Sequence, residues 1–168
     1  MFNLCLVLTA GTLISDMVSL ITIGDVSGYP SWVNILVNSI YFICIISCLS
    51  IVAAYVFYLL FEYMPEQKCY KIASKLILSM WIVLTLLVFV NLKTGWYFYF
   101  ENNAYCRGPL NKLGFIVMGV EVCMLCACYF RNRKVVTPYA LNLVKAIPPV
   151  VMMLTVLQFA FPTIVLTG

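Results

Sequence analysis

A few polar side chains set within long apolar runs are the residues of this sequence that could do chemistry. A charged or strongly polar side chain inside a membrane is costly, so it faces a partner, a water-filled cavity or a functional site. Alternatively, each one holds two helices together through an interhelical hydrogen bond worth about 1 kcal/mol. The sequence leaves both interpretations open for Asp16, Asn34, Asn38, Asn91, Arg107, Glu121 and Gln158.

Catalytic and metal-binding chemistry is not expected. The chain has no histidine, which removes the commonest general base and metal ligand at neutral pH. Cys123, Cys126 and Cys128 have a spacing seen in metal sites, but they fall within an apolar segment where thiolates are hard to ionise. We therefore expect the cysteines to act as small packing residues, with no catalytic residue, metal or cofactor.

The composition predicts an all-α, polytopic transmembrane helix bundle. Apolar residues make up 64% of the chain and charged residues only 10%, with a mean hydropathy of +1.05. A helix needs about 20 apolar residues to cross the hydrocarbon core of a bilayer. Five segments meet this requirement within a single domain over residues 1–168, and the predicted spans are 2–23, 32–61, 72–92, 109–130 and 139–161.

The charges between the spans predict the orientation. Lys68, Lys71 and Lys75 follow the second span, and Arg131 and Arg133 follow the fourth. By the positive-inside rule these gaps are cytoplasmic, so the N-terminus lies inside and the loops 24–31 and 93–109 lie outside. We expect a multi-pass protein of the cell membrane that binds no nucleic acid. Because an apolar, external C-terminus suits a cytoplasmic signal poorly, we also expect the chain to be part of a longer protein.

The loop between the third and fourth spans is the densest run of unusual residues. Gly95 can end a helix in the left-handed conformation, and Pro109 can start the next one. Residues 98–100 are aromatic and can be extended, while 101–103 favour a turn. The sequence therefore predicts a small hairpin that covers the outer end of the bundle.

This loop resembles the N-terminal multi-span membrane sensor region of GGDEF-type diguanylate cyclases from Gram-positive bacteria. The resemblance implies a signal-input module of a bacterial cyclic di-GMP signalling protein, which dimerises through its full-length form. The family's further N-terminal helix and its GGDEF domain are not found in this sequence, so no enzyme activity is expected from these residues. The matching residues are Asn91, Thr94, Gly95, the aromatic run 96–100, Glu101, Asn102, Tyr105, Cys106, Arg107, Gly108, Pro109 and Leu110, with Pro148, Pro149 and Gln158 in the last span.

The polar residues and the hairpin together predict an outward-facing pocket for a small molecule or a lipid. Apolar walls with a few orienting polar groups are the usual composition of such sites. Glu121 would lie deeper, near the membrane midplane, as a functional acid. The alternative function is a small transporter or channel subunit that uses Asp16 and Glu121. The predicted ligand-binding residues are Asp16, Asn34, Asn38, Asn91, Trp96, Tyr99, Arg107 and Gln158.

Overall fold

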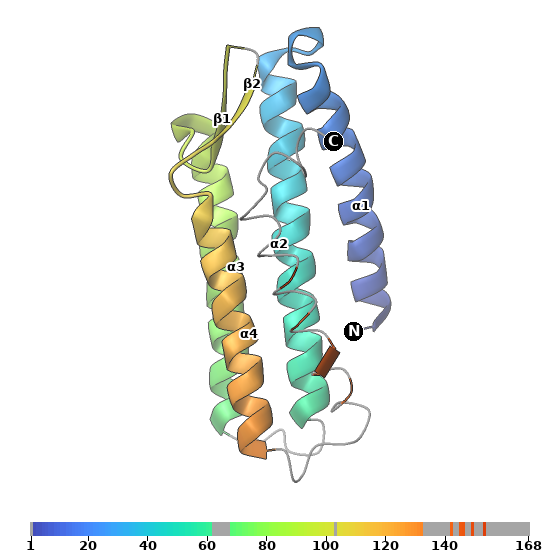
Figure 1. The fold of residues 1–168 in the computed structure, drawn as a ribbon, viewed down its shortest axis with the longest axis vertical. Helices are drawn as coiled ribbons and strands as arrows, with labels where there is room; N and C mark the ends of the chain where they lie inside the picture. The colour runs from blue at the N-terminus through green and yellow to red at the C-terminus, as the bar shows by residue number, and fades with distance from the viewer. Residues whose placement is uncertain are drawn as a thin grey trace.

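The computed structural model describes residues 2–61, 68–102 and 104–132, and isolated positions at 142, 145, 146, 149 and 153. This part of the chain is mostly helical, with one short hairpin (Figure 1). In chain order the elements are α1 (Phe2–Gly24), η1 (Val26–Gly28), α2 (Ser31–Phe61), α3 (Lys68–Thr94), β1 (Phe98–Glu101), β2 (Ala104–Arg107) and α4 (Lys112–Asn132).

Four helices of the described part are long and apolar enough to cross a membrane. The shortest of these spans has 20 residues, which at about 1.5 Å per residue matches the thickness of the hydrocarbon core. Outward-facing apolar side chains agree with a lipid surrounding, since Val7, Ile14 and Met17 of α1 are each more than 60% exposed. The predicted fifth span, 139–161, lies outside the described residues apart from isolated positions, and it stays a prediction.

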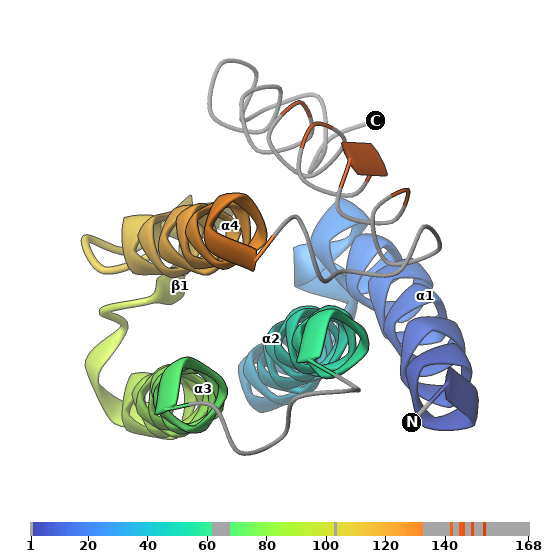
Figure 2. The ribbon, with the colours of Figure 1, turned by 90° about the horizontal axis from the view of Figure 1, so that it is seen from below.

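Helix α2 is the centre of the bundle. It packs against α1 on one side and against α3 and α4 on the other (Figure 2). Polar side chains tie the helices together, because Ser19 of α1 donates to Asn38 of α2 (2.8 Å) and Trp81 of α3 donates to Ser47 of α2 (3.0 Å). In an apolar surrounding such bonds hold helices in register, at about 1 kcal/mol each.

A compact aromatic and aliphatic cluster closes one end of the α2–α3–α4 group. Phe57 and Phe61 of α2 stack with ring centroids 6.5 Å apart. They pack with Ile77 of α3 and Leu125 of α4, and all four side chains are at least 95% buried. This end of the bundle is therefore densely packed, whereas the opposite end opens towards the hairpin.

The two ends of the bundle differ in charge as the sequence predicts. The α1–α2 connection and the hairpin lie together at one end (Figure 1), and the exposed side chains of Lys68, Lys75 and Arg131 lie at the other. Arg133 is outside the described residues. The described basic residues at the hairpin end are Lys93, Arg107 and Lys112, against Lys68, Lys71, Lys75 and Arg131 at the other end. The compartment that each end faces stays a prediction.

The predicted hairpin is confirmed. Strands β1 and β2 pair antiparallel, with Phe98 opposite Arg107 and Glu101 opposite Ala104. Asn102 takes the left-handed conformation at the turn, with φ 50°, which asparagine tolerates better than most residues. Gly95 has φ 66° and donates its N–H to the Asn91 carbonyl at 3.2 Å, so it ends α3 as predicted.

The predicted start of the fourth helix at Pro109 is wrong, because α4 begins at Lys112. Before that point the backbone is bonded to the hairpin segment instead of to a helix. The Gly108 N–H donates to the Tyr97 carbonyl (3.0 Å) and the Leu110 N–H donates to the Trp96 carbonyl (2.9 Å). The tertiary contact therefore delays the helix. The third helix, α3, runs from Lys68 to Thr94 and is therefore longer than the predicted span 72–92.

The contact of residues 108–110 with residues 96–97 can be tested by a substitution at Gly108. A Cβ at this position would lie 2.2 Å from the Trp96 carbonyl oxygen, which is a backbone atom and cannot move aside cheaply. We expect Gly108→Ala to destabilise the protein by roughly 1–3 kcal/mol, as other overpacking substitutions do. Gly119→Ala is the matched control because nothing lies within 4 Å of its added methyl group. The measurement is the melting temperature in detergent. Equal melting temperatures for the parent and both variants would contradict the close contact at Gly108.

Orientation can be tested with one exposed position at each end. In a background without cysteines, Glu101→Cys should react with a membrane-impermeant thiol reagent added to intact cells, because residue 101 lies in the exposed hairpin turn. Lys68→Cys, at an exposed position of the basic end that precedes the membrane span, should react only after the membrane is permeabilised. The reverse pattern would overturn the predicted orientation.

Candidate functional site

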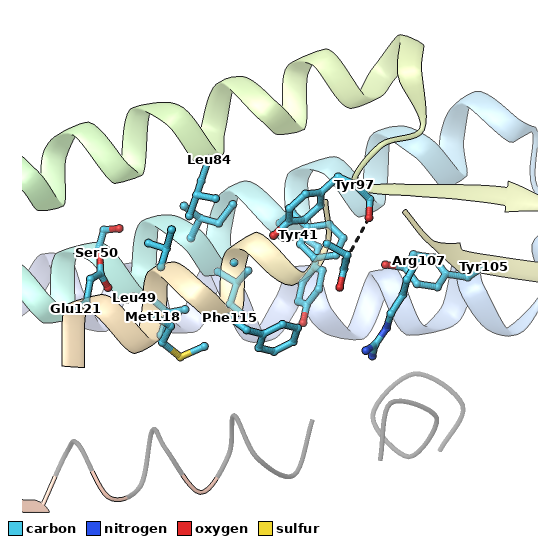
Figure 3. Close-up of a pocket in the computed structure, with 16 residues that line it drawn as sticks. Tyr41, Leu49, Ser50, Leu84, Tyr97, Tyr105, Arg107, Phe115, Met118 and Glu121 are labelled. Atoms are coloured by element: carbon cyan, nitrogen blue, oxygen red, sulfur yellow. Dashed lines mark hydrogen bonds between the residues drawn. The ribbon is translucent and has the colours of Figure 1, made fainter. Parts of the chain in front are cut away.

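A cavity of about 100 Å³ lies between α2, α3 and α4, beneath the hairpin (Figure 3). Its walls are mostly apolar, and its polar groups gather at the two ends. One end lies under the hairpin, and the other lies deeper between the helices. The lining residues are Tyr41, Phe42, Ile45, Ile46, Leu49, Ser50, Leu84, Tyr97, Tyr105, Arg107, Asn111, Gly114, Phe115, Val117, Met118 and Glu121.

Asn91 anchors the hairpin over this cavity. Its side-chain oxygen accepts hydrogen bonds from the backbone N–H groups of Tyr97 (2.6 Å) and Phe98 (3.2 Å). Its side-chain nitrogen donates to the Phe98 carbonyl at 3.0 Å. The residue is only 4% exposed, so these bonds satisfy backbone groups that would otherwise be buried without partners. Asn91 therefore acts on the hairpin and does not line the cavity.

Tyr97 is held in place from several sides. Its carbonyl accepts from the Asn111 side chain at 3.2 Å, the bond drawn as a dashed line in Figure 3. Its ring meets Phe42 of α2 edge to face, with centroids 4.8 Å apart. Its hydroxyl lies against Gly114 of α4, where a Cβ would approach it to 2.8 Å. The absence of a side chain at residue 114 thus makes room for the Tyr97 hydroxyl next to the cavity.

Phenol groups surround the end of the cavity under the hairpin. Burial raises the pKa of Tyr97 to about 12. Burial also raises the pKa of Tyr105 well above its usual range, and the neighbouring Arg107 opposes this shift only in part. Both phenols are therefore neutral at any physiological pH and can donate hydrogen bonds.

Tyr41 connects this end of the cavity to α1. The residue belongs to α2 and lines the cavity, and its phenol lies close enough to the Asp16 carboxyl group on α1 to interact with it electrostatically. Asp16 itself is not among the cavity-lining residues. Asp16 therefore does not line the cavity in this arrangement, contrary to the prediction. It can act on a ligand in the cavity only through the Tyr41 side chain.

Glu121 lies at the deeper end of the cavity, next to Ser50 of α2 (Figure 3). The residue is 5% exposed, and one carboxyl oxygen, Oε1, is buried without a hydrogen-bond partner among the described residues. Burying a carboxyl group without a partner is costly. This group is consequently the feature of the cavity that most needs an explanation. Its location within an apolar helix agrees with the prediction, while its functional role is untested.

The structure brings few of the predicted pocket residues together. Arg107 lines the cavity, whereas Trp96 and Tyr99 are 51% and 40% exposed on the outer side of the hairpin segment. Gln158 lies outside the described residues. The eight-residue pocket is therefore not assembled as predicted within the described part of the chain.

The two asparagines of α2 occupy the contact with α1 and its connection. The Asn38 side chain accepts from Ser19 and donates to the Asn34 carbonyl at 2.8 Å. The Asn34 side chain donates to the Val26 carbonyl at 3.1 Å. Asn34 also borders a separate hollow of about 410 Å³ with Val26, Tyr29 and residues of the hairpin. Both side chains thus hold helices and loop together.

Sequence reasoning missed most of the polar lining. Tyr41, Ser50 and Asn111 lie in apolar or loop segments where nothing distinguishes them from packing residues. Tyr97 and Tyr105 turn inward, whereas Trp96 and Tyr99 of the same loop are exposed. Strand alternation separates Tyr105 from Tyr99, because Tyr105 pairs with Phe100, the neighbour of Tyr99, but it gives no sign of the inward position of Tyr97, which precedes β1.

Metal and sulfur chemistry find no support in the described residues. In residues 2–61, 68–102 and 104–132, no group of three metal-ligating side chains comes together. Cys123 is exposed on α4, while Cys126 and Cys128 are half-buried, and none of the three forms a disulfide within the described residues. Their role as small packing residues stays a prediction.

The importance of the hairpin anchor can be measured by graded substitutions. Asn91→Ala leaves two N–H groups and one carbonyl buried without their partner, and should cost roughly 3 kcal/mol or more of unfolding free energy. Asn111→Ala removes one hydrogen bond to the Tyr97 carbonyl, which still accepts a hydrogen bond from the Gly108 N–H. This substitution should therefore lower the free energy of unfolding by only about 1 kcal/mol. The exposed Lys93→Ala is the control. The measurement is the free energy of unfolding by chemical denaturation in detergent. Equal values for the Asn91 and Lys93 variants would contradict the role of Asn91 in anchoring the hairpin.

Comparison with known proteins adds no family assignment. No protein-family model, curated protein or solved structure matches this chain. What the chain does must therefore be inferred from the cavity, the hairpin and the motif within residues 91–110.

Proposed function

We propose that this chain is the membrane-embedded signal-input module of a bacterial signalling protein. The observation that carries the proposal is the cavity, which is covered by an anchored hairpin and has polar groups at both ends of an apolar interior. This is the usual composition of a small-molecule site. A small ligand would reach it from the end where the hairpin lies, which we assign to the outside of the cell membrane.

A ligand in the cavity would have a physical route to the rest of the bundle. It would contact α2, α3 and α4 at once, and it would also affect α1 through the electrostatic interaction between Tyr41 and Asp16. A ligand shifts an arrangement of helices only if it binds one arrangement better than another. The helix ends at Lys68 and Arg131 would carry that shift to the opposite side of the membrane.

The output that we propose is cyclic di-GMP synthesis. The support is the resemblance of residues 91–110 to the sensor regions of GGDEF-type diguanylate cyclases. The catalytic domain would follow in the longer protein, and the full-length protein would work as a homodimer. The lipid bilayer and a small-molecule or lipid ligand are the partners that this function requires.

A transporter or channel subunit is the second candidate, and the buried Glu121 is the observation that favours it. A conduit must continue through the membrane. Below Glu121 and Ser50, however, the cluster around Phe57, Ile77 and Leu125 is tightly packed in the described part of the chain. This arrangement favours a blind cavity, hence a receptor over a conduit. Ligand-dependent flux through proteoliposomes of the purified protein would reverse the preference.

The sensor function predicts that changes at the cavity alter signalling without loss of protein. In the full-length gene product, Arg107→Ala and Tyr41→Phe should change the cellular cyclic di-GMP level at least about twofold, at equal amounts in the membrane. The first removes a cation that lines the cavity, and the second removes the hydroxyl group that interacts with Asp16. Met17→Leu is the control because Met17 is 67% exposed beside Asp16. Unchanged cyclic di-GMP in both cavity variants would contradict the proposal.

A further inference from the structure

We infer that the cavity takes a small organic amine, with its ammonium group against Glu121 and its apolar body between α2, α3 and α4. The inference deepens the proposed function, since it names the ligand class of the same site. It stands on the geometry of the cavity, independently of the output domain.

The first argument is the unpartnered oxygen of Glu121. The side chain is 95% buried, borders the cavity, and leaves Oε1 without a hydrogen-bond partner among the described residues. A buried carboxylate needs donors or a positive charge nearby, because its removal from water costs several kcal/mol. Oε1 itself has almost no accessible surface, but the Glu121 side chain lines the cavity, so an occupant would lie beside this carboxyl group.

The second argument is the distribution of charge around the cavity. Among the described residues that line the cavity, Arg107 is the only basic one, and it lies under the hairpin at the other end (Figure 3). Helix α4 begins at Lys112, so Glu121 lies nine residues further along it, which corresponds to about 14 Å of helix. Arg107 therefore does not compensate the charge of Glu121. An anionic ligand at the deeper end would be repelled, and a cationic one would be attracted.

The third argument is the chemistry of the walls. Leu49, Leu84 and Met118 surround the space between the two polar ends, so the body of the ligand must be apolar. An ammonium group offers three donors, and its hydrogen bonds to a carboxylate are roughly twice as strong as those of a neutral hydroxyl. Ser50 lies beside Glu121 as a further polar contact. A primary amine on a short hydrocarbon fits this combination better than an alcohol does.

The volume limits the size of the ligand. A cavity of about 150 Å³ accepts benzene, and one water molecule occupies about 30 Å³ of liquid. On this scale of about 25–30 Å³ per non-hydrogen atom, a cavity of about 100 Å³ holds a chain of about four. The hydrocarbon chain of n-butylamine has four carbon atoms, with the ammonium group at its end, and n-butanol and butyrate have the same number of carbon atoms but differ in charge.

The test compares these three probes on the protein in lipid nanodiscs, by saturation-transfer NMR with empty nanodiscs subtracted. Ligands this small bind in the millimolar range. We expect n-butylamine to bind at least tenfold more tightly than n-butanol or butyrate. Glu121→Gln should remove this tenfold preference and leave the affinity for n-butanol within threefold of the parent. Glu101→Gln, the same change in the exposed hairpin turn, should have no effect.

Several results would overturn the inference. Equal binding of the three probes, a preference for butyrate, or an amine preference that survives Glu121→Gln would each contradict it. Absence of binding by any probe would show that the cavity holds water only. Leu84→Phe, which fills the cavity, should abolish binding of all three and provides a variant independent of Glu121.

The outcome is separable from the sensor function. Amine binding with the expected Glu121 dependence but without any cyclic di-GMP response would support the amine site and contradict the sensor. Cyclic di-GMP changes in the cavity variants without an amine preference would contradict the amine site alone.

Discussion

The hydrogen bonds of the Asn91 side chain are the interaction on which the cavity depends. Near the end of a membrane helix, backbone groups that leave regular structure must find partners within the protein. One amide side chain satisfies three such groups of Tyr97 and Phe98, and thereby turns the chain back over the bundle. Without this anchor the aromatic residues that follow would have no fixed place. The roof of the cavity, and the inward position of the Tyr97 ring, follow from it.

The second constraint is the uneven packing of the bundle along its length. Towards the basic end, Phe57 and Phe61 fill the space between α2, α3 and α4. Towards the hairpin, rings of Phe42, Tyr97 and Phe98 pack over the helices and leave a cavity below them. Large side chains at one end and a hairpin at the other thus produce a blind cavity. Such a shape suits the binding of a small molecule better than its passage.

The polar residues within the helices divide into two groups with different roles. Asn38, Ser19, Trp81 and Ser47 form closed pairs between neighbouring helices, which agrees with a role in holding the bundle together. Among the described residues, Asn34, Thr85 and Glu121 each leave one buried oxygen without a partner, and of these three only Glu121 borders the cavity between α2, α3 and α4. A closed pair needs nothing further, while an open acceptor in an apolar site does. This contrast is the physical basis for assigning a ligand to the cavity.

The sequence by itself determined the membrane class, the described spans, the charge difference between the two ends and the hairpin between the third and fourth spans. These properties are local, since hydropathy, loop charge and turn residues act over a few neighbouring positions. Only the tertiary structure decided which polar residues meet. Asn91 turns to the hairpin backbone, Asn34 and Asn38 to the α1 contact, and Glu121 to the cavity. That choice depends on how helices rotate and pack against each other, and helical spacing in the sequence does not specify the rotation of a helix with apolar residues on every side.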